Sequence, residues 1–278
     1  MPHPRKILPS LSPSGSILFS LLFCFVSFSA SAVTCISTDN GSLNDPAIFG
    51  EYQNSHQDSA CGKDFTLNYT VGSGTEVIWD DNITLSGTLV NQGTFNIQAA
   101  GLFEGGLKNE GTLKIAPGTE GDVNFRGGWV NQGTFKAENA RLHWQGSTRL
   151  ESGSVELNGV SLKISGHFQE SGDDFSVQSS NLELSGRTVW MVPRSLTFTE
   201  LFLHGNTLLL GDNATELRVS NKLTMDQASD QIILGLGSLK LLEGLELQQG
   251  YLSVGDGALD LGGTSLVETE GLLDLSGG

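Results

Sequence analysis

Two pairs of adjacent aspartates are the residues of this 278-residue chain that are best suited to chemistry. Asp80–Asp81 and Asp173–Asp174 could bind Ca²⁺, because carboxylate oxygens are its preferred ligands. Lys163 or Arg187 would then have to act as the base that abstracts a proton from a bound substrate. Adjacent acids in a strand, however, point to opposite faces, and acids in turns serve the backbone conformation. A structural role is therefore the simpler interpretation.

Other catalytic patterns are missing from the sequence. It contains no GxSxG, P-loop, HExxH or CxxC motif. His143 and His167 lie ten and fourteen residues after the glycine of their repeats, so we do not expect them to stack on one face. Gly255–Gly257 is a single Gly-Asp-Gly triplet without the period of calcium-binding repeats. We expect Trp129 to pack in the core, whereas Trp144 could be an exposed platform for a sugar.

The first 32 residues have the pattern of a secretory signal peptide. Arg5 and Lys6 precede an apolar run over residues 17–28, and the small residues of Ala30–Ala32 follow. The run is too short for a membrane-spanning helix, so we expect cleavage after Ala32; an uncleaved anchor is the alternative. The mature chain would then have no integral membrane segment and would be secreted, either extracellular or on the cell surface.

Charge and cysteine content agree with export. The chain has 31 acidic side chains against 15 Lys and Arg, a net charge of −16, which becomes more negative when Arg5 and Lys6 are removed. Such a charge argues against nucleic acid as a partner and favours attraction to cations such as Ca²⁺. Cleavage also removes Cys24 and leaves Cys35 and Cys61. We predict a disulfide between these two, with two free thiols as the alternative.

A repeat of about 20 residues decides the fold. LVNQGTFNI, LKNEGTLKI, WVNQGTFKA and RLESGSVEL start at residues 89, 107, 129 and 149, and their glycines are Gly93, Gly111, Gly133 and Gly153. The residues two and four places after each glycine are apolar, which is the period of a strand. At Gly172 the apolar pair is displaced by one residue. The same glycine device returns, less regularly, at Gly237, Gly250 and Gly271.

Short strands with one apolar face cannot bury that face alone, but stacked copies can. We therefore predict an all-β fold, a right-handed parallel β-helix (β-solenoid) of about ten coils over residues 80–278. Each glycine would occupy a corner where φ is positive or where stacked backbones approach closely.

Asn91, Asn109 and Asn131 occupy the same place in three coils, two residues before the glycine. Their amides could stack into a hydrogen-bonded ladder, or each could simply favour a turn. Neither alternative makes them binding residues.

The xNxGTLxI-like coils behind a signal peptide resemble secreted bacterial β-helix proteins, the filamentous-haemagglutinin-type adhesins and autotransporter passenger domains. The resemblance is best over residues 83–177, and it implies a fold rather than a ligand. The chain has no NPNL-type secretion motif and no LPxTG sorting signal, so the export route stays open. It ends in mid-repeat at LLDLSGG, which suggests a fragment of a longer protein.

Residues 33–79 lack the 20-residue repeat and contain both mature cysteines. We expect a disulfide-pinned N-terminal cap that covers the first coil, with an independent binding module as the alternative.

The predicted function is that of a noncatalytic secreted or cell-surface β-solenoid rod, structural or adhesive. Its partners would be glycans or components of a host or matrix surface, and calcium at Asp173 or Asp174 could bridge an anionic glycan. We expect no other cofactor. The alternative is a polysaccharide-degrading β-helix enzyme, a lyase or hydrolase, because β-helix lyases bind calcium through clustered acids. Coils of 18–22 residues, however, leave no long loops to build a catalytic cleft.

Overall fold

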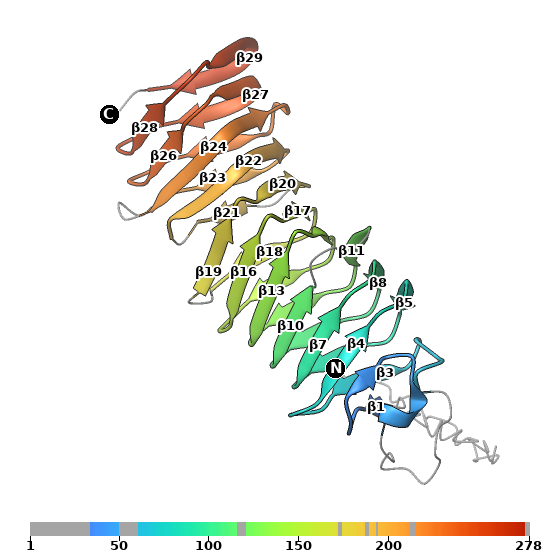
Figure 1. Ribbon diagram of the computed structural model, residues 1–278. Helices are drawn as coiled ribbons and strands as arrows, with labels where there is room; N and C mark the ends of the chain where they lie inside the picture. The colour runs from blue at the N-terminus through green and yellow to red at the C-terminus, as the bar shows by residue number, and fades with distance from the viewer. Residues whose placement is uncertain are drawn as a thin grey trace, which may run out of the picture. The chain divides into compact units, whose positions relative to one another are not determined.

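The computed structural model describes residues 34–49, 61–115, 121–171, 174–186, 189–192, 194–211 and 215–275. The expected signal peptide, together with Gly172, Asp173 and Arg187, lies outside these residues. The described chain is almost entirely β-strand, with a single short 3-10 helix, η1 (Pro46–Ile48). Its strands pair in parallel from one coil to the next (Figure 1). The predicted all-β fold, a β-solenoid with coils of about 20 residues, is confirmed.

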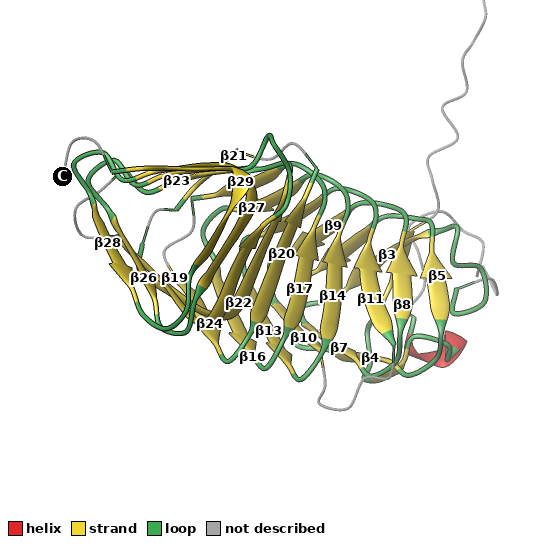
Figure 2. Ribbon diagram, turned by 90° about the horizontal axis from the view of Figure 1, so that it is seen from above, coloured by secondary structure: helices red, strands yellow, loops and turns green. Residues whose placement is uncertain are grey.

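Up to β20, each complete coil places one strand on each of three faces (Figure 2). The first face consists of β1 (Thr34–Ile36), β3 (Asn68–Val71), β6 (Leu89–Asn91), β9 (Leu107–Asn109), β12 (Trp129–Asn131), β15 (Thr148–Leu150) and β18 (Phe168–Glu170). The second face consists of β2 (Gly41–Ser42), β4 (Glu76–Trp79), β7 (Thr94–Ile97), β10 (Thr112–Ile115), β13 (Thr134–Glu138), β16 (Ser154–Asn158) and β19 (Asp174–Gln178). The third face consists of β5 (Ile83–Leu85), β8 (Gly101–Phe103), β11 (Asp122–Phe125), β14 (Arg141–Trp144), β17 (Ser161–Ile164) and β20 (Asn181–Ser185).

The coils after β20 use longer strands that turn a corner without ending. These are β22 (Leu196–His204), β24 (Glu216–Met225), β27 (Leu245–Ser253) and β29 (Leu266–Asp274). The shorter strands between them are β21 (Val189–Met191), β23 (Thr207–Leu209), β25 (Gln231–Ile233), β26 (Ser238–Leu241) and β28 (Ala258–Leu261). Register shifts within the pairs β22–β24 and β27–β29 mark the bends.

The strand register reproduces the sequence repeat. Thr94, Thr112, Thr134 and Ser154, the residues after the four repeat glycines, are partners in neighbouring strands. Phe175 pairs with Val155, so the displaced pair after Gly172 belongs to the same inward rows. The one-residue displacement of the apolar pair after Gly172 therefore reflects one more residue between that glycine and the inward pair than in the earlier coils.

Close approach of stacked backbones is what requires the repeat glycines. A Cβ at Gly111, Gly133 or Gly153 would lie within 3 Å of the carbonyl oxygen of the corresponding glycine one coil earlier. None of the three has a positive φ, so of the two reasons predicted for corner glycines only the steric one applies.

A second glycine row, which was not predicted, lies at the corner between the third and first faces. It consists of Gly87, Gly105, Gly127, Gly146 and Gly166, each packed against the backbone of the coil before it. The apolar residues that follow the later glycines Gly237 and Gly250 are buried, but these glycines occupy different corners. Gly237 precedes the second-face strand β26, whereas Gly250 and Gly271 pair with each other at the corner that leads to the first face.

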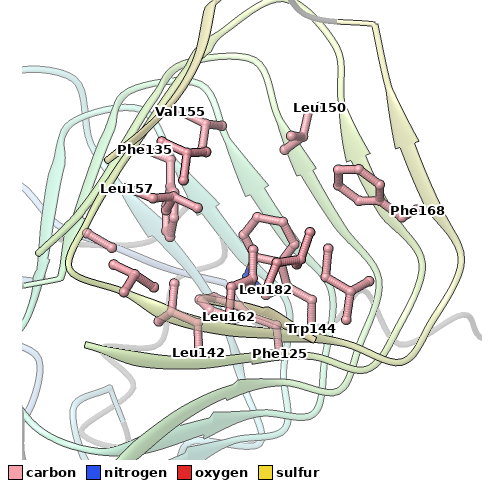
Figure 3. Close-up of a cluster of buried hydrophobic side chains, with 14 of the residues drawn as sticks. Phe125, Phe135, Leu142, Trp144, Leu150, Val155, Leu157, Leu162, Phe168 and Leu182 are labelled. Carbon is pink, nitrogen blue, oxygen red and sulfur yellow. The ribbon is translucent and has the colours of Figure 1, made fainter. Parts of the chain in front are cut away.

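The core is a stack of inward side chains from all three faces. Aromatic rings continue through it: Phe103 and Phe125 are parallel with centroids 4.9 Å apart, and Trp129 and Trp144 meet edge to face at 5.1 Å. Figure 3 shows Phe125, Phe135 and Trp144 pointing into this interior. Trp129 is buried as expected. The hypothesis of an exposed sugar platform at Trp144 is wrong, because its side chain is 0% exposed.

The ladders already begin inside the segment that was expected to be a cap. β1 pairs with β3 and β2 with β4, so residue 79 is not a break in the stacking. The predicted Cys35–Cys61 disulfide is present, with the two Cα atoms 5.7 Å apart. Asp80 accepts a hydrogen bond from Ser42 Oγ at 2.7 Å, and Asp81 accepts one from Asn44 Nδ2 at 2.8 Å. This acidic pair therefore fastens the N-terminal loop to the first complete coil.

Candidate functional site

The outer surface of the second face carries three parallel rows of polar side chains. Because alternate residues of a strand point outward and the strands are in register, equivalent side chains repeat from coil to coil. The first row contains Thr94, Thr112, Thr134, Ser154 and Asp174. The second row contains Asn96, Lys114, Lys136, Glu156 and Ser176. Glu138, Asn158 and Gln178 form the third row, which Gln98 precedes along the face.

Two adjoining hollows follow these rows, and we call them together the second-face groove. The first has a volume of about 460 Å³ and is lined by residues from β7, β10, β13 and β16. The second, of about 670 Å³, is lined by β16 and β19 and reaches Arg194. Glu156 and Asn158 line both hollows, so the two adjoin at β16.

The groove offers hydrogen-bond donors and acceptors rather than a single strong charge. Lys136 Nζ lies 2.7 Å from Glu156 Oε2, and Lys114 is its in-register neighbour on the other side. Ser154 Oγ donates to Thr134 Oγ1 at 3.3 Å. Exposed ion pairs of this kind contribute only about 0–1 kcal/mol, so a ligand can replace them at little cost.

An amide ladder lies beneath the corner that leads into the groove. Asn91 Nδ2 donates to Asn109 Oδ1 at 2.7 Å, and Asn109 Nδ2 donates to Asn131 Oδ1 at 2.7 Å. Asn109 also donates to the Thr134 carbonyl oxygen at 3.0 Å. All three asparagines are 0% exposed. Of the two alternatives for these residues, the structure has the ladder, and it fixes the register of the coils rather than contacting a ligand.

Two histidines, His143 and His204, lie on the third face. His143 Nε2 lies 2.7 Å from Ser165 Oγ, and burial, assisted by the charge of Lys163, lowers the pKa of His143. His204 Nδ1 lies 2.8 Å from Asp226 Oδ1. His167 is exposed in the turn before β18, so it does not stack with His143.

Of the residues considered for lyase chemistry, Lys163 and Asp174 lie on different faces, whereas Asp173 and Arg187 are outside the described residues. Lys163 lies in β17 on the third face and forms an ion pair with Glu183 at 2.6 Å, whereas Asp174 begins β19 on the second face. Within the described residues there is no group of three or more His, Cys, Asp or Glu that could hold a metal ion. Calcium binding therefore stays a prediction.

Sequence reasoning did not identify the groove. Its signal was available in the residues between the apolar pairs, such as Asn96, Lys114 and Lys136, which are polar in every coil. Recognising that these positions form one surface requires the register of the coils.

The comparisons with known proteins add no relationship. No protein-family profile matches the chain, and neither a curated protein nor a solved structure matches it significantly. Among the described residues there is also no helix of sufficient length and apolar character to cross a membrane.

Proposed function

We propose that this protein is a noncatalytic secreted or cell-surface β-solenoid, similar in role to bacterial adhesins or autotransporter passenger domains, and that its second-face groove binds extended polymers such as glycans. The observation that carries the proposal is the groove itself. It presents hydroxyl, amide, ammonium and carboxylate groups in rows that repeat with each coil, at the strand spacing of about 4.8 Å.

Repetition favours a repeating ligand. A polymer that contacts one coil weakly can contact several coils at once, so modest interactions combine through effective concentration. Hydroxyl-rich chains such as glycans match the mixture of donors and acceptors along the three rows, and components of a host or matrix surface carry such chains.

Two further observations support an extracellular, noncatalytic role. A disulfide persists in oxidising compartments, and Cys35–Cys61 joins the first strand to the loop before β3. The two hollows of the groove are partly open to solvent, and a site that is open to solvent is poorly suited to exclude water around a reaction.

A matched pair of tryptophan substitutions tests the groove. Asn158 lines both hollows, whereas Asn181 begins β20 on the third face. We expect the wild-type protein to be retained on pectin, alginate or chondroitin sulfate columns, and Asn158→Trp to reduce retention at least about tenfold, which corresponds to about 1.4 kcal/mol. Asn181→Trp should bind like the wild type.

Product formation is followed in the same samples through reducing and unsaturated ends. Equal retention of both variants would reject the groove as the binding surface. Sustained formation of new chain ends by the wild-type protein would instead favour the enzyme alternative.

A further inference from the structure

Most Lys and Arg side chains in the described part of the chain form an ion pair with an acid. Arg141 Nε lies 2.9 Å from Asp122 Oδ1, and Lys163 Nζ lies 2.6 Å from Glu183 Oε1, in each case between in-register residues of neighbouring strands. This arrangement is expected in a chain with 31 acidic side chains against 15 Lys and Arg. A cation without an acidic partner is therefore an exception in this protein.

Two cations that lie in second-face strands are such exceptions, and each has another cation beside it. Lys114 is the in-register neighbour of Lys136, and Arg218 is the in-register neighbour of Lys240. Among the described residues, neither Lys114 nor Arg218 forms an ion pair with an acid. We call Lys114 with Lys136, and Arg218 with Lys240, the two cation pairs.

The two cation pairs occupy the same position of the repeat. Lys136 stands three residues after Gly133, and Lys240 stands three residues after Gly237. In both cases the next coil has an acid at this position. The order cation, cation, acid therefore occurs twice at the same outward position of the coil.

The acid holds the second cation of each pair. Lys136 Nζ donates to both carboxylate oxygens of Glu156, at 2.8 and 2.7 Å. Lys240 Nζ lies 3.0 Å from Asp260 Oδ2. The charge of the second cation is thus balanced by the coil that follows it.

The first cation of each pair has an uncharged neighbour on its other side. Asn96 is the in-register neighbour of Lys114, and Thr197 is that of Arg218. Lys114 is exposed and Arg218 is half-buried, and both alternate with buried residues of their strands, so their side chains are directed outward. No neighbour in the row therefore balances the charge of the first cation.

Two like charges in neighbouring strands repel each other, because the strands are only about 4.8 Å apart. An anion bound in front of such a pair relieves the repulsion and accepts charge-assisted hydrogen bonds from both cations. Lysine and arginine both bind carboxylate and sulfate groups, arginine in a bidentate manner. Each cation pair is therefore suited to a carboxylate or sulfate group of a ligand.

We propose that the two cation pairs are anion subsites, and that they make the protein selective for acidic glycans, which carry carboxylate or sulfate groups. This inference rests on the proposed function, because Lys114 and Lys136 line the second-face groove. The net charge of −16 does not create the preference, since it repels polyanions. Salt screens the distant acids over about 8 Å, so direct contacts at the cation pairs determine which glycans bind.

Two matched sets of polymers test the anion subsites. Pectate differs from fully methyl-esterified pectin in its free carboxylates, and dextran sulfate differs from dextran in its sulfates. With EDTA present, the wild-type protein should bind the charged polymer of each set about tenfold more tightly than the neutral one, because two exposed charge contacts combine. The EDTA removes calcium, which could otherwise bridge the acids of the protein to an anionic glycan.

Substitutions in each cation pair identify the residues responsible. Lys114→Gln and Arg218→Gln should each weaken binding to the charged polymers about three- to fivefold, and the double variant about tenfold, with binding to the neutral polymers unchanged. Lys63→Gln is the matched control, because Lys63 is exposed in the turns before β3 and the substitution removes the same charge. This control should bind like the wild type.

The results separate this inference from the proposed function. Equal binding of charged and neutral polymers by the wild-type protein, or unchanged binding by the double variant, would overturn the anion subsites; loss of binding in Asn158→Trp would then still support the groove. A preference for charged polymers that arises only when calcium is added would overturn the subsites in favour of a calcium bridge. If the wild-type protein binds none of the polymers, the proposed function and the anion subsites are both wrong.

Discussion

Replacement of Asn109 by leucine separates the contribution of the amide ladder from that of packing. Leucine has the branched shape and the same number of side-chain heavy atoms as asparagine, so the substitution removes hydrogen bonds without opening a cavity. It removes the two bonds to Asn91 and Asn131 and the bond to the Thr134 carbonyl oxygen. The neighbouring amides then keep buried polar atoms with fewer partners.

The cost can be estimated from those atoms. Asn131 Oδ1 loses its donor from Asn109, and Asn91 Nδ2 keeps only the Thr112 carbonyl oxygen. Each buried group without a partner costs about 1–3 kcal/mol, so Asn109→Leu should lower the free energy of unfolding by about 2–5 kcal/mol. Replacing all three asparagines by leucine removes the stranded amides as well. The triple variant should therefore lose no more stability than the single variant.

Urea unfolding followed by tryptophan fluorescence measures both variants, because all four tryptophans are buried. The informative quantity is the deviation from additivity across the set of single and triple variants. Independent contributions would make the triple variant roughly three times as costly as the average single variant. That result would refute the cooperative ladder.

Three further predictions concern stability. Phe95→Asp should lower the free energy of unfolding by roughly 4 kcal/mol or more, because it buries a charge at a 0% exposed position. Asn96→Asp, whose side chain points outward, should have only a mild effect. Thermal melts that show equal effects of the two substitutions would contradict the inward and outward assignment. Gly133→Ala should lower the free energy of unfolding by at least about 2 kcal/mol, because the new Cβ meets the stacked backbone. Gly211→Ala, which has open space around it, should change that free energy by no more than about 0.5 kcal/mol. Urea titrations measure both variants. Reduction of the disulfide should cost about 3–4 kcal/mol, and intact mass with and without reduction before alkylation checks both its presence and a mature start at Val33.

The sequence was sufficient to predict the fold because each coil carries the same pattern of glycine and apolar residues within its own stretch of about 20 residues. Every coil must bury two apolar residues after a glycine, so Phe95, Leu113 and Phe135 show the same period even without a structure. The role of Gly133 followed from the same pattern. The glycine row of Gly87 was missed, although its glycines stand two residues before an inward residue of the first face, as Gly87 stands before Leu89.

Features that depend on contacts between coils could not be predicted in the same way. Asp80 was a calcium candidate by its type, but its role depends on Ser42, which comes from the coil before. Trp144 was interpreted from its local sequence, and its burial results from packing against Trp129.

The stacking pattern has a consequence for how the chain folds. Side-chain hydrogen bonds between coils join residues that are close in sequence, such as Asn91 with Asn109 at a separation of 18 and Asn109 with Thr134 at 25. Each loop closure is therefore short, and its entropic cost is similar for every coil. A new coil needs only the exposed strand edges of the preceding coil as a template. Each coil therefore interacts only with its two neighbours, as in other repeat proteins. The polypeptide can thus gain structure one coil at a time, without waiting for its distant end.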